Sequence, residues 1–189
     1  MIGARDDGWG MLRGMKRIAF DMDDVLADTL GAQLAWFRAR HGYRWTRGDL
    51  VGKRIFEDLA TAPQVAEHDE VLHEGSFFGD LPVMPGAVEV VRELARRHEV
   101  YVASAATEFP RSCAPKLEWL GRHFPFLPAS RVVFCGDKGI LDADVLVDDG
   151  VHHLRRFRGQ GIVFDAPHNV GEAGFPRVKS WEDLARLLL

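Results

Sequence analysis

The feature that most constrains the fold is a series of short apolar segments that alternate with helical patterns along the chain. The apolar segments are rich in β-branched and aromatic residues and are only four to six residues long, which favours buried strands over helices. Between them, apolar residues recur every three or four positions, as in Val88, Val91 and Leu94, which is typical of amphipathic helices. Strands that alternate with helices form parallel sheets. We therefore expect an α/β fold with a doubly wound parallel sheet of about five strands, at residues 17–21, 99–104, 131–135, 144–147 and 161–165.

More than 75 residues separate the first two expected strands. A crossover connection needs far fewer, so this stretch predicts an inserted unit. Its pattern predicts helices at 30–41, from Thr46 to Ala60, and from Pro63 to about Gly75. Further helices are expected at 87–98, 115–124 and after Ser180. The expected organisation is a flexible tail at 1–15, a core formed by 16–29 and 85–189, and a small α-helical cap at 30–84 above the carboxyl edge of the first strand.

Composition excludes several classes of function. The 189 residues carry a net charge of −4, which provides no basic field for a nucleic-acid polymer. No apolar run reaches the length needed to span a bilayer, so no membrane partner is expected. The two cysteines, Cys113 and Cys135, are too few for a disulfide framework, and we expect a cytoplasmic location. The sequence does not determine the oligomeric state, and it is compatible with a homodimer.

Residues capable of chemistry stand at the carboxyl ends of four expected strands, where ligands bind in open α/β sheets. Acid pairs at one edge repel each other and favour a divalent cation, and oxygen ligands beside a lysine favour Mg²⁺ and a phosphate. These residues are Asp21 and Asp23, Ser104, Lys138, and the pair Asp148 and Asp149.

The spacing Asp-x-Asp has its own chemical logic. The chain turns directly after the strand, so Asp21 can face the centre of the site while Asp23 approaches from the side of a leaving group. One carboxylate can then attack phosphorus while the other manages the proton.

These motifs resemble those of the haloacid dehalogenase superfamily of phosphatases. The segment FDMDDVLAD is similar to the first motif, Asp-x-Asp-x-[Thr/Val], and Ser104, Lys138 and Asp148-Asp149 match the second, third and fourth motifs in order. Within the superfamily, the chain is most similar to the 5′(3′)-deoxyribonucleotidases over about 16–189. The segments that carry this similarity are DLPVMPGAVEVVREL, SAATEFPRSCAPKLEWL, GDKGILDADVLVDD and APHN.

The resemblance implies a Mg²⁺-dependent phosphomonoesterase with a Rossmann-like core that acts on nucleoside (deoxy)monophosphates. Asp21 is then the nucleophile that forms an aspartyl-phosphate, and Asp23 protonates the departing oxygen and later activates water. The implied ligands of Mg²⁺ are Asp21, the main-chain carbonyl of Asp23, and Asp149, with Asp148 further from the ion or linked through water. The implied contacts to the phosphoryl group come from Ser104, Ala105, Lys116 and Lys138. In the insertion, Tyr43 and Trp45 are the candidates to stack on a nucleobase.

The sequence departs from the family pattern at two positions. Asp24 stands where the family usually has glycine, and Gly136 stands where some relatives have arginine. Asp24 adds a negative charge near an expected anion site, whereas Lys116 is expected to compensate for the missing arginine.

Two other functions stay open. The same chemistry serves a phosphatase or mutase for a small sugar phosphate, and the cap decides between these substrates. A non-catalytic phosphate-sensing or regulatory domain also combines acids, a hydroxyl and a lysine on a doubly wound sheet. Such domains lack a large cap, whereas about 55 residues are inserted here, which favours catalytic turnover behind a lid.

Overall fold

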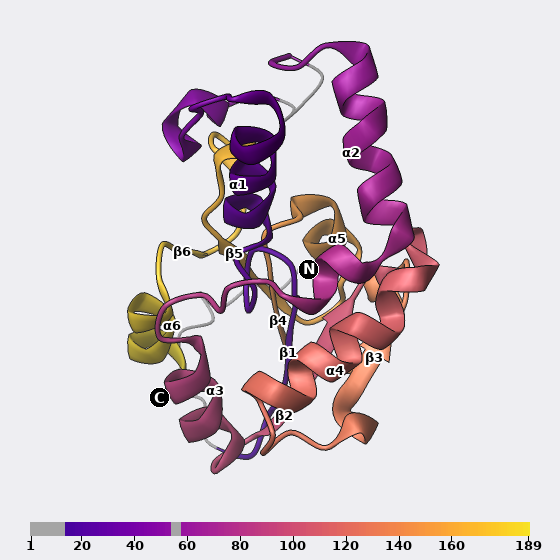
Figure 1. The fold of residues 1–189 in the computed structure, drawn as a ribbon. Coiled ribbons are helices and arrows are strands. Elements are labelled where there is room, and N and C mark those ends of the chain that lie inside the picture. The colour runs from indigo at the N-terminus through magenta and orange to yellow at the C-terminus, as the bar shows by residue number, and fades with distance from the viewer. Residues whose placement is uncertain (1–13, 54–57) are drawn as a thin grey trace.

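The computed structural model describes residues 14–53 and 58–189 and contains, within these ranges, a six-stranded parallel sheet (Figure 1). The strand order is β3-β2-β1-β4-β5-β6, which confirms the doubly wound α/β prediction. The five expected strands are present within one or two residues of their predicted ends. The strands are β1 (Arg17–Phe20), β2 (Glu99–Ser104), β3 (Val132–Phe134), β4 (Val145–Asp148), β5 (Gln160–Phe164) and β6 (Arg177–Val178). The short edge strand β6 was not predicted, because two residues carry no periodicity.

The pairing of β1 with its neighbours brings the carboxyl ends of three strands to one edge. Phe20 is in register with Val102 of β2 and with Val147 of β4. The next residue, Asp21, still donates its main-chain N–H to the carbonyl of Val147 at 2.9 Å. The side chains that follow β1 and β4 therefore start from the same height on the sheet.

Helices cover both faces of the sheet. On one face, α3 (Ala87–Ala95), α4 (Cys113–His123) and α6 (Trp181–Leu188) pack on Phe20 and its neighbours. The other face is covered by α5 (Val151–Arg156), which packs on the smaller side chains of Ala19 and Ala103. Short 3₁₀ turns complete the core: η3 (Ala106–Glu108), η4 (Pro110–Ser112), η5 (Ala129–Arg131), η6 (Lys138–Ile140) and η7 (Pro167–Asn169). Among the described helices, none combines the length and the apolar character needed to cross a lipid bilayer.

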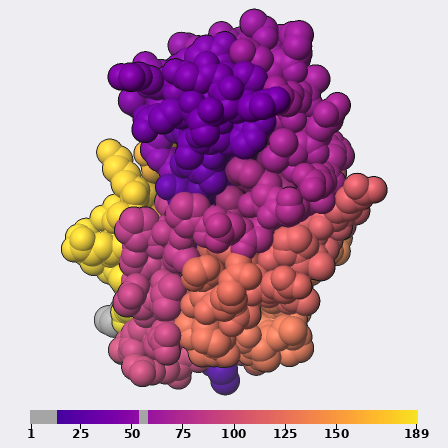
Figure 2. All heavy atoms as spheres, viewed as in Figure 1, coloured from indigo at the N-terminus to yellow at the C-terminus, as the bar shows by residue number. Residues whose placement is uncertain are grey.

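The segment that connects β1 to α3 rises above the sheet. Figure 1 shows α1 (Thr29–His41) and α2 (Ala62–Glu74) at the top of the molecule, and Figure 2 shows the indigo atoms of the α1 region gathered there. Helix α1 ends at Gly42 and α2 ends at Gly75, which agrees with the predicted ends of these helices, and both glycines take the left-handed conformation. The turn η2 (Ser76–Gly79) follows α2 and leads back to the core.

The helix predicted from Thr46 to Ala60 is wrong over most of the part that the structure describes, 46–53 and 58–60. The capping box forms, since Asp49 accepts hydrogen bonds from the N–H and the hydroxyl of Thr46, but only the 3₁₀ turn η1 (Arg47–Leu50) follows. The chain is extended at Val51, and Gly52 has a φ of 70°, which ends helical geometry. Residues 54–57 of this prediction, and 1–13 of the predicted tail, lie outside the described ranges.

Candidate active site

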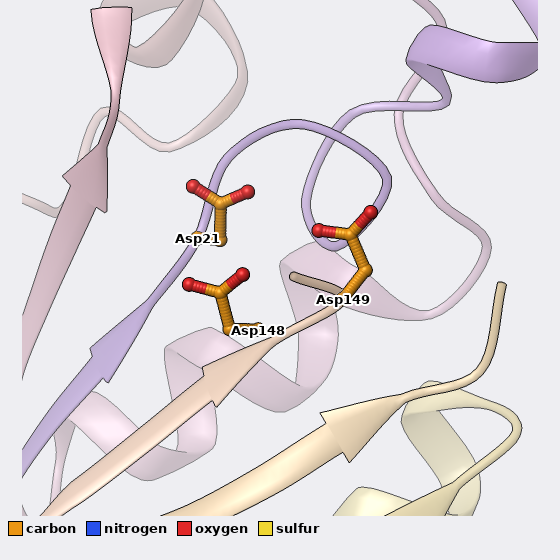
Figure 3. A group of neighbouring side chains, drawn as sticks. All are labelled: Asp21, Asp148 and Asp149. Atoms are coloured by element: carbon orange, nitrogen blue, oxygen red, sulfur yellow. The ribbon is translucent and has the colours of Figure 1, made fainter. Parts of the chain in front are cut away.

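Three carboxylates meet at the carboxyl edge of the sheet. Asp21 follows β1, Asp148 ends β4, and Asp149 comes next in the chain (Figure 3). One oxygen from each lies within 4.8 Å of the others. The side chains of Asp21 and Asp148 are almost fully buried, and that of Asp149 is 14% exposed. The structure thus brings together three of the four predicted metal ligands.

A buried lysine stands beside this acid cluster. Lys138, from η6 after β3, donates to Oδ1 of Asp21 and to Oδ2 of Asp148, each at 2.6 Å. Burial alone would lower the pKa of Lys138, but the charges and hydrogen bonds of the two carboxylates raise it above its usual value. Lys138 is therefore a fixed positive charge beside Asp21.

One ammonium group does not balance three acids. Burial raises the pKa of Asp21 to about 6, against the opposing charge of Lys138. Burial, together with the charges of Asp21 and Asp148, raises the pKa of Asp149 well above its usual value. A bound cation would relieve this repulsion, and a set of carboxylate oxygens suits a hard divalent ion. The donor set therefore fits a metal site.

The side chain of Asp23 belongs to a different cluster. Its Oδ1 accepts a hydrogen bond from the Thr29 hydroxyl at 2.9 Å, and its Oδ2 accepts one from Nζ of Lys116. Lys116 is buried in α4, donates also to the Ser104 hydroxyl at 3.1 Å, and lies 4.4 Å from the centre of the Phe78 ring. The two carboxylates of the Asp-x-Asp pair are therefore each held by a different buried lysine.

Asp24 is bound to the start of α1 and also lines the cavity that the acid cluster lines. It is the one non-glycine residue with a positive φ, 53°, among the described residues, and its Oδ1 accepts the main-chain N–H of Leu30 at 2.8 Å. Burial raises its pKa to about 7, with the Leu30 hydrogen bond opposing this shift. Oδ1 of Asp24 is thus bound at the start of a helix.

A cavity of about 300 Å³ lies over both clusters. The polar residues that line it include the acids that follow β1 and β4 and the two buried lysines, Lys116 and Lys138. Ala105 lines it as well, while the Ser104 side chain is fully buried and contacts Lys116. The segment above the sheet contributes Thr29, Gln33, Leu72 and Phe78.

The expectation that Tyr43 and Trp45 reach this site is not met. Neither is among the described residues that line the cavity. Their rings stack on each other with centroids 4.0 Å apart and an interplanar angle of 14°, and the Tyr43 hydroxyl donates to Gln64. Packing within the segment above the sheet thus uses one face of each of these two rings.

Three histidines for which no role was predicted, His152, His153 and His168, line the cavity. Nε2 of His168 lies 3.3 Å from the carbonyl oxygen and 3.3 Å from Oδ2 of Asp149. The neighbouring Asn169 donates to the same carbonyl at 2.9 Å. The histidines lie four or five residues after the ends of β4 and β5, and this position was the signal that could have identified them, since such segments lie at the carboxyl edge.

Comparisons with known proteins agree with this geometry. The family model described as 5′ nucleotidase, deoxy (pyrimidine), cytosolic type C protein matches residues 15–189. The 5′(3′)-deoxyribonucleotidases of Bacillus subtilis strain 168 and of Bacillus phage SPbeta are each 42% identical over 174 residues, covering 92% of this chain and 99% of theirs.

Solved structures share the fold at low identity. A haloacid dehalogenase-like protein from Agrobacterium tumefaciens aligns with a TM-score of 0.59 and 16% identity, covering 92% of this chain and 97% of the other. A haloacid dehalogenase family hydrolase from Deinococcus radiodurans, with bound phosphate and sodium, aligns with a TM-score of 0.57 and 19% identity at the same coverage.

Proposed function

The chain belongs to the family of 5′ nucleotidase, deoxy (pyrimidine), cytosolic type C proteins, and we propose that it hydrolyses deoxyribonucleoside monophosphates with the aid of Mg²⁺. It is a phosphomonoesterase with the haloacid dehalogenase fold, so the resemblance seen in the sequence motifs is confirmed. The observation that carries the proposal is that two buried lysines hold the two carboxylates of the Asp-x-Asp pair separately beneath one cavity.

In this proposal, a carboxylate oxygen of Asp21 attacks phosphorus while the bond to the nucleoside oxygen breaks. Asp23 gives its proton to that oxygen as it departs. Water then attacks the phosphorus of the aspartyl-phosphate, Asp23 takes the proton of this water, and the Asp21 carboxylate is restored. The contacts of Asp23 to Thr29 and Lys116 support this assignment, because they orient its carboxyl group at the cavity.

Lys138 and Lys116 have complementary roles. Lys138 stabilises the carboxylate form of Asp21 and then balances the charge of the phosphoryl group. Lys116, with Ser104 and the main chain at Ala105, binds the phosphoryl oxygens on the other side. The burial and the hydrogen bonds of both lysines support these two separate roles, because they fix each ammonium group in place.

Mg²⁺ would be held by Asp21, Asp148 and Asp149, together with the main-chain carbonyl of Asp23. When bound, it supplies positive charge for the phosphoryl oxygens and for the nucleophile. The carbonyl of Asp149 is held by Asn169, which keeps this acid oriented toward the cluster.

Residues 30–84 serve as the cap in this proposal. They contribute Gln33, Leu72 and Phe78 to the cavity. The apolar side chains suit the apolar parts of a nucleoside, and the amide of Gln33 can form a hydrogen bond with it. We also propose a cytoplasmic location, in line with the family description and with two cysteines that form no disulfide.

The test is phosphate release from a panel of deoxyribonucleoside and ribonucleoside 5′- and 3′-monophosphates and small sugar phosphates, with Mg²⁺ present. We expect the deoxyribonucleotides to give the highest kcat/KM, and Asp21→Asn to abolish release on all of them. An equal or higher kcat/KM on the sugar phosphates would overturn the nucleotide assignment. Release that survives Asp21→Asn would overturn the nucleophile.

A further inference from the structure

Asp24 occupies a backbone conformation that favours glycine. Its φ of 53° lies in the left-handed region, which costs a side chain about 1–2 kcal/mol. Asp24 is nevertheless buried, and its Oδ1 accepts a hydrogen bond from the N–H of Leu30 at 2.8 Å. The first turn of α1 carries partial positive charge, so the Leu30 hydrogen bond opposes the effect of burial on the pKa of Asp24. The acceptor oxygen Oδ1 of Asp24 is therefore part of the attachment of α1 to the loop after β1.

The adjacent residues of α1 and of this loop make a second bond. Thr29, which precedes Leu30, donates its hydroxyl to Oδ1 of Asp23, which precedes Asp24. Two consecutive acids of the loop thus hold two consecutive residues of the helix. The two hydrogen bonds and the main chain between these residues form a closed ring. A movement of Leu30 therefore also moves the neighbouring Thr29 hydroxyl, which orients Asp23.

We propose that Asp24 is a positioning residue for the acid–base group Asp23, and that it acts through the first turn of α1 and the Thr29 hydroxyl. This inference rests on the proposed function, in which Asp23 protonates the leaving oxygen. It gives Asp24 a structural role besides its place in the lining of the cavity, because Oδ1 accepts the Leu30 N–H.

Three variants separate the hydrogen bond from the charge and from the backbone. Asp24→Gly suits the positive φ and removes the acceptor, so the loop keeps its conformation while α1 loses its attachment. Asp24→Asn keeps an acceptor oxygen, tolerates the left-handed region and removes only the charge. Thr29→Val has nearly the same shape as threonine and removes the hydroxyl that contacts Asp23, with Thr29→Ser as its matched control.

The readout is the dependence of kcat/KM on the leaving group. A deoxyribonucleoside 5′-phosphate releases an alkoxide that needs a proton, whereas p-nitrophenyl phosphate releases a phenolate that does not. Hydrolysis of the aspartyl-phosphate is common to both substrates and does not enter kcat/KM, which reports steps through departure of the leaving group. General loss of structure lowers both values alike, so the ratio of the two reports the orientation of Asp23 alone.

We expect Asp24→Gly and Thr29→Val to lower kcat/KM on the nucleotide by about tenfold or more, part of the effect of a general acid. The loss on p-nitrophenyl phosphate should stay within about threefold, and Asp24→Asn and Thr29→Ser should stay near wild type on both. Equal losses on the two substrates, no loss on the nucleotide, or an Asp24→Asn variant as impaired as Asp24→Gly would each overturn the inference. If the wild type hydrolyses no nucleotide, the proposed function fails, and the same comparison on an alkyl phosphate that it does hydrolyse tests Asp24 independently.

Discussion

Nζ of Lys138 lies 2.6 Å from Oδ1 of Asp21, although 117 residues separate them in the sequence. The same ammonium group also holds Asp148, while Asp149 has no such contact to it. With all three acids ionised, the cluster keeps two negative charges that Lys138 does not balance, and this excess matches the charge of one divalent cation. We therefore expect Lys138 to balance one of the three negative charges and a divalent cation to balance the other two.

Replacing Lys138 with methionine should destabilise the metal-free protein by about 3–5 kcal/mol, because it leaves buried carboxylates without their cation. Saturating Mg²⁺ should recover part of this loss, since the ion neutralises the same groups. Chemical unfolding with EDTA and with Mg²⁺ measures both values. Lys179→Met, at an exposed position, is the control. A loss no larger than that of the control, or one that Mg²⁺ leaves unchanged, would contradict the prediction.

Mg²⁺ affinity should fall as the pH is lowered through about 6. Burial raises the pKa of Asp21 to about 6 and raises that of Asp149 well above its usual value, so at lower pH these carboxylates take up protons that the ion must displace. At pH 8 Asp21 is ionised and binds without this cost. One displaced proton weakens the apparent affinity by about tenfold per pH unit. Calorimetric titration of Mg²⁺ at pH 5 and pH 8 measures the change, and an equal affinity at both values would refute it.

The sequence allowed the site to be located because strand ends in a parallel sheet share one edge. Asp21, Lys138 and Asp149 could be placed together from their positions alone, before any contact was known. Local patterns could not give the direction of the side chains above the sheet. Tyr43 and Trp45 carry the chemistry of a base-stacking site, but they pack on each other, and this choice depends on their neighbours in three dimensions.

The ends of two helices were predicted well, and in both cases a glycine takes the left-handed conformation there. The helix predicted from a capping signal at its start was too long. Gly42 and Gly75 end α1 and α2 as expected. The signal at Thr46 starts a single turn, because the residues after Leu50 leave helical geometry at once. A capping box therefore indicates where a helix can begin, but the following residues decide its length.

The two helix stops should respond differently to alanine. A Cβ atom at Gly75 would lie 2.5 Å from the main-chain carbon and oxygen of Arg111, whereas one at Gly42 would meet no atom within 4 Å. Both glycines have positive φ, so each substitution costs about 1–2 kcal/mol of backbone strain. Gly75→Ala must also displace a main chain, which adds about 1–3 kcal/mol. The free energies of unfolding of the two variants test this prediction. Equal losses of stability would contradict it, because they would show that the main chain at 111–112 moves aside at no cost.

His68 is buried in α2 among aromatic rings of the segment above the sheet. Its ring centroid lies 5.0 Å from those of Trp36 and Phe37 and 6.2 Å from that of Phe77. Burial lowers the pKa of His68 to about 4, although the charge of Asp69 opposes this shift. The folded protein therefore holds His68 neutral at pH values where the unfolded chain, with a pKa near 6.5, already binds a proton.

Acidification should consequently destabilise the protein through His68. Above pH 6.5 neither state is protonated there and its contribution to stability is fully present; as the pH falls toward 4, only the unfolded state gains the proton, and that contribution is lost. His68→Leu cannot take up this proton, so its thermal midpoint should fall less between pH 7 and pH 5 than that of the wild type. His73→Leu removes an exposed histidine of the same helix and should follow the wild type. Parallel curves for wild type and His68→Leu would mean that His68 is protonated alike in both states.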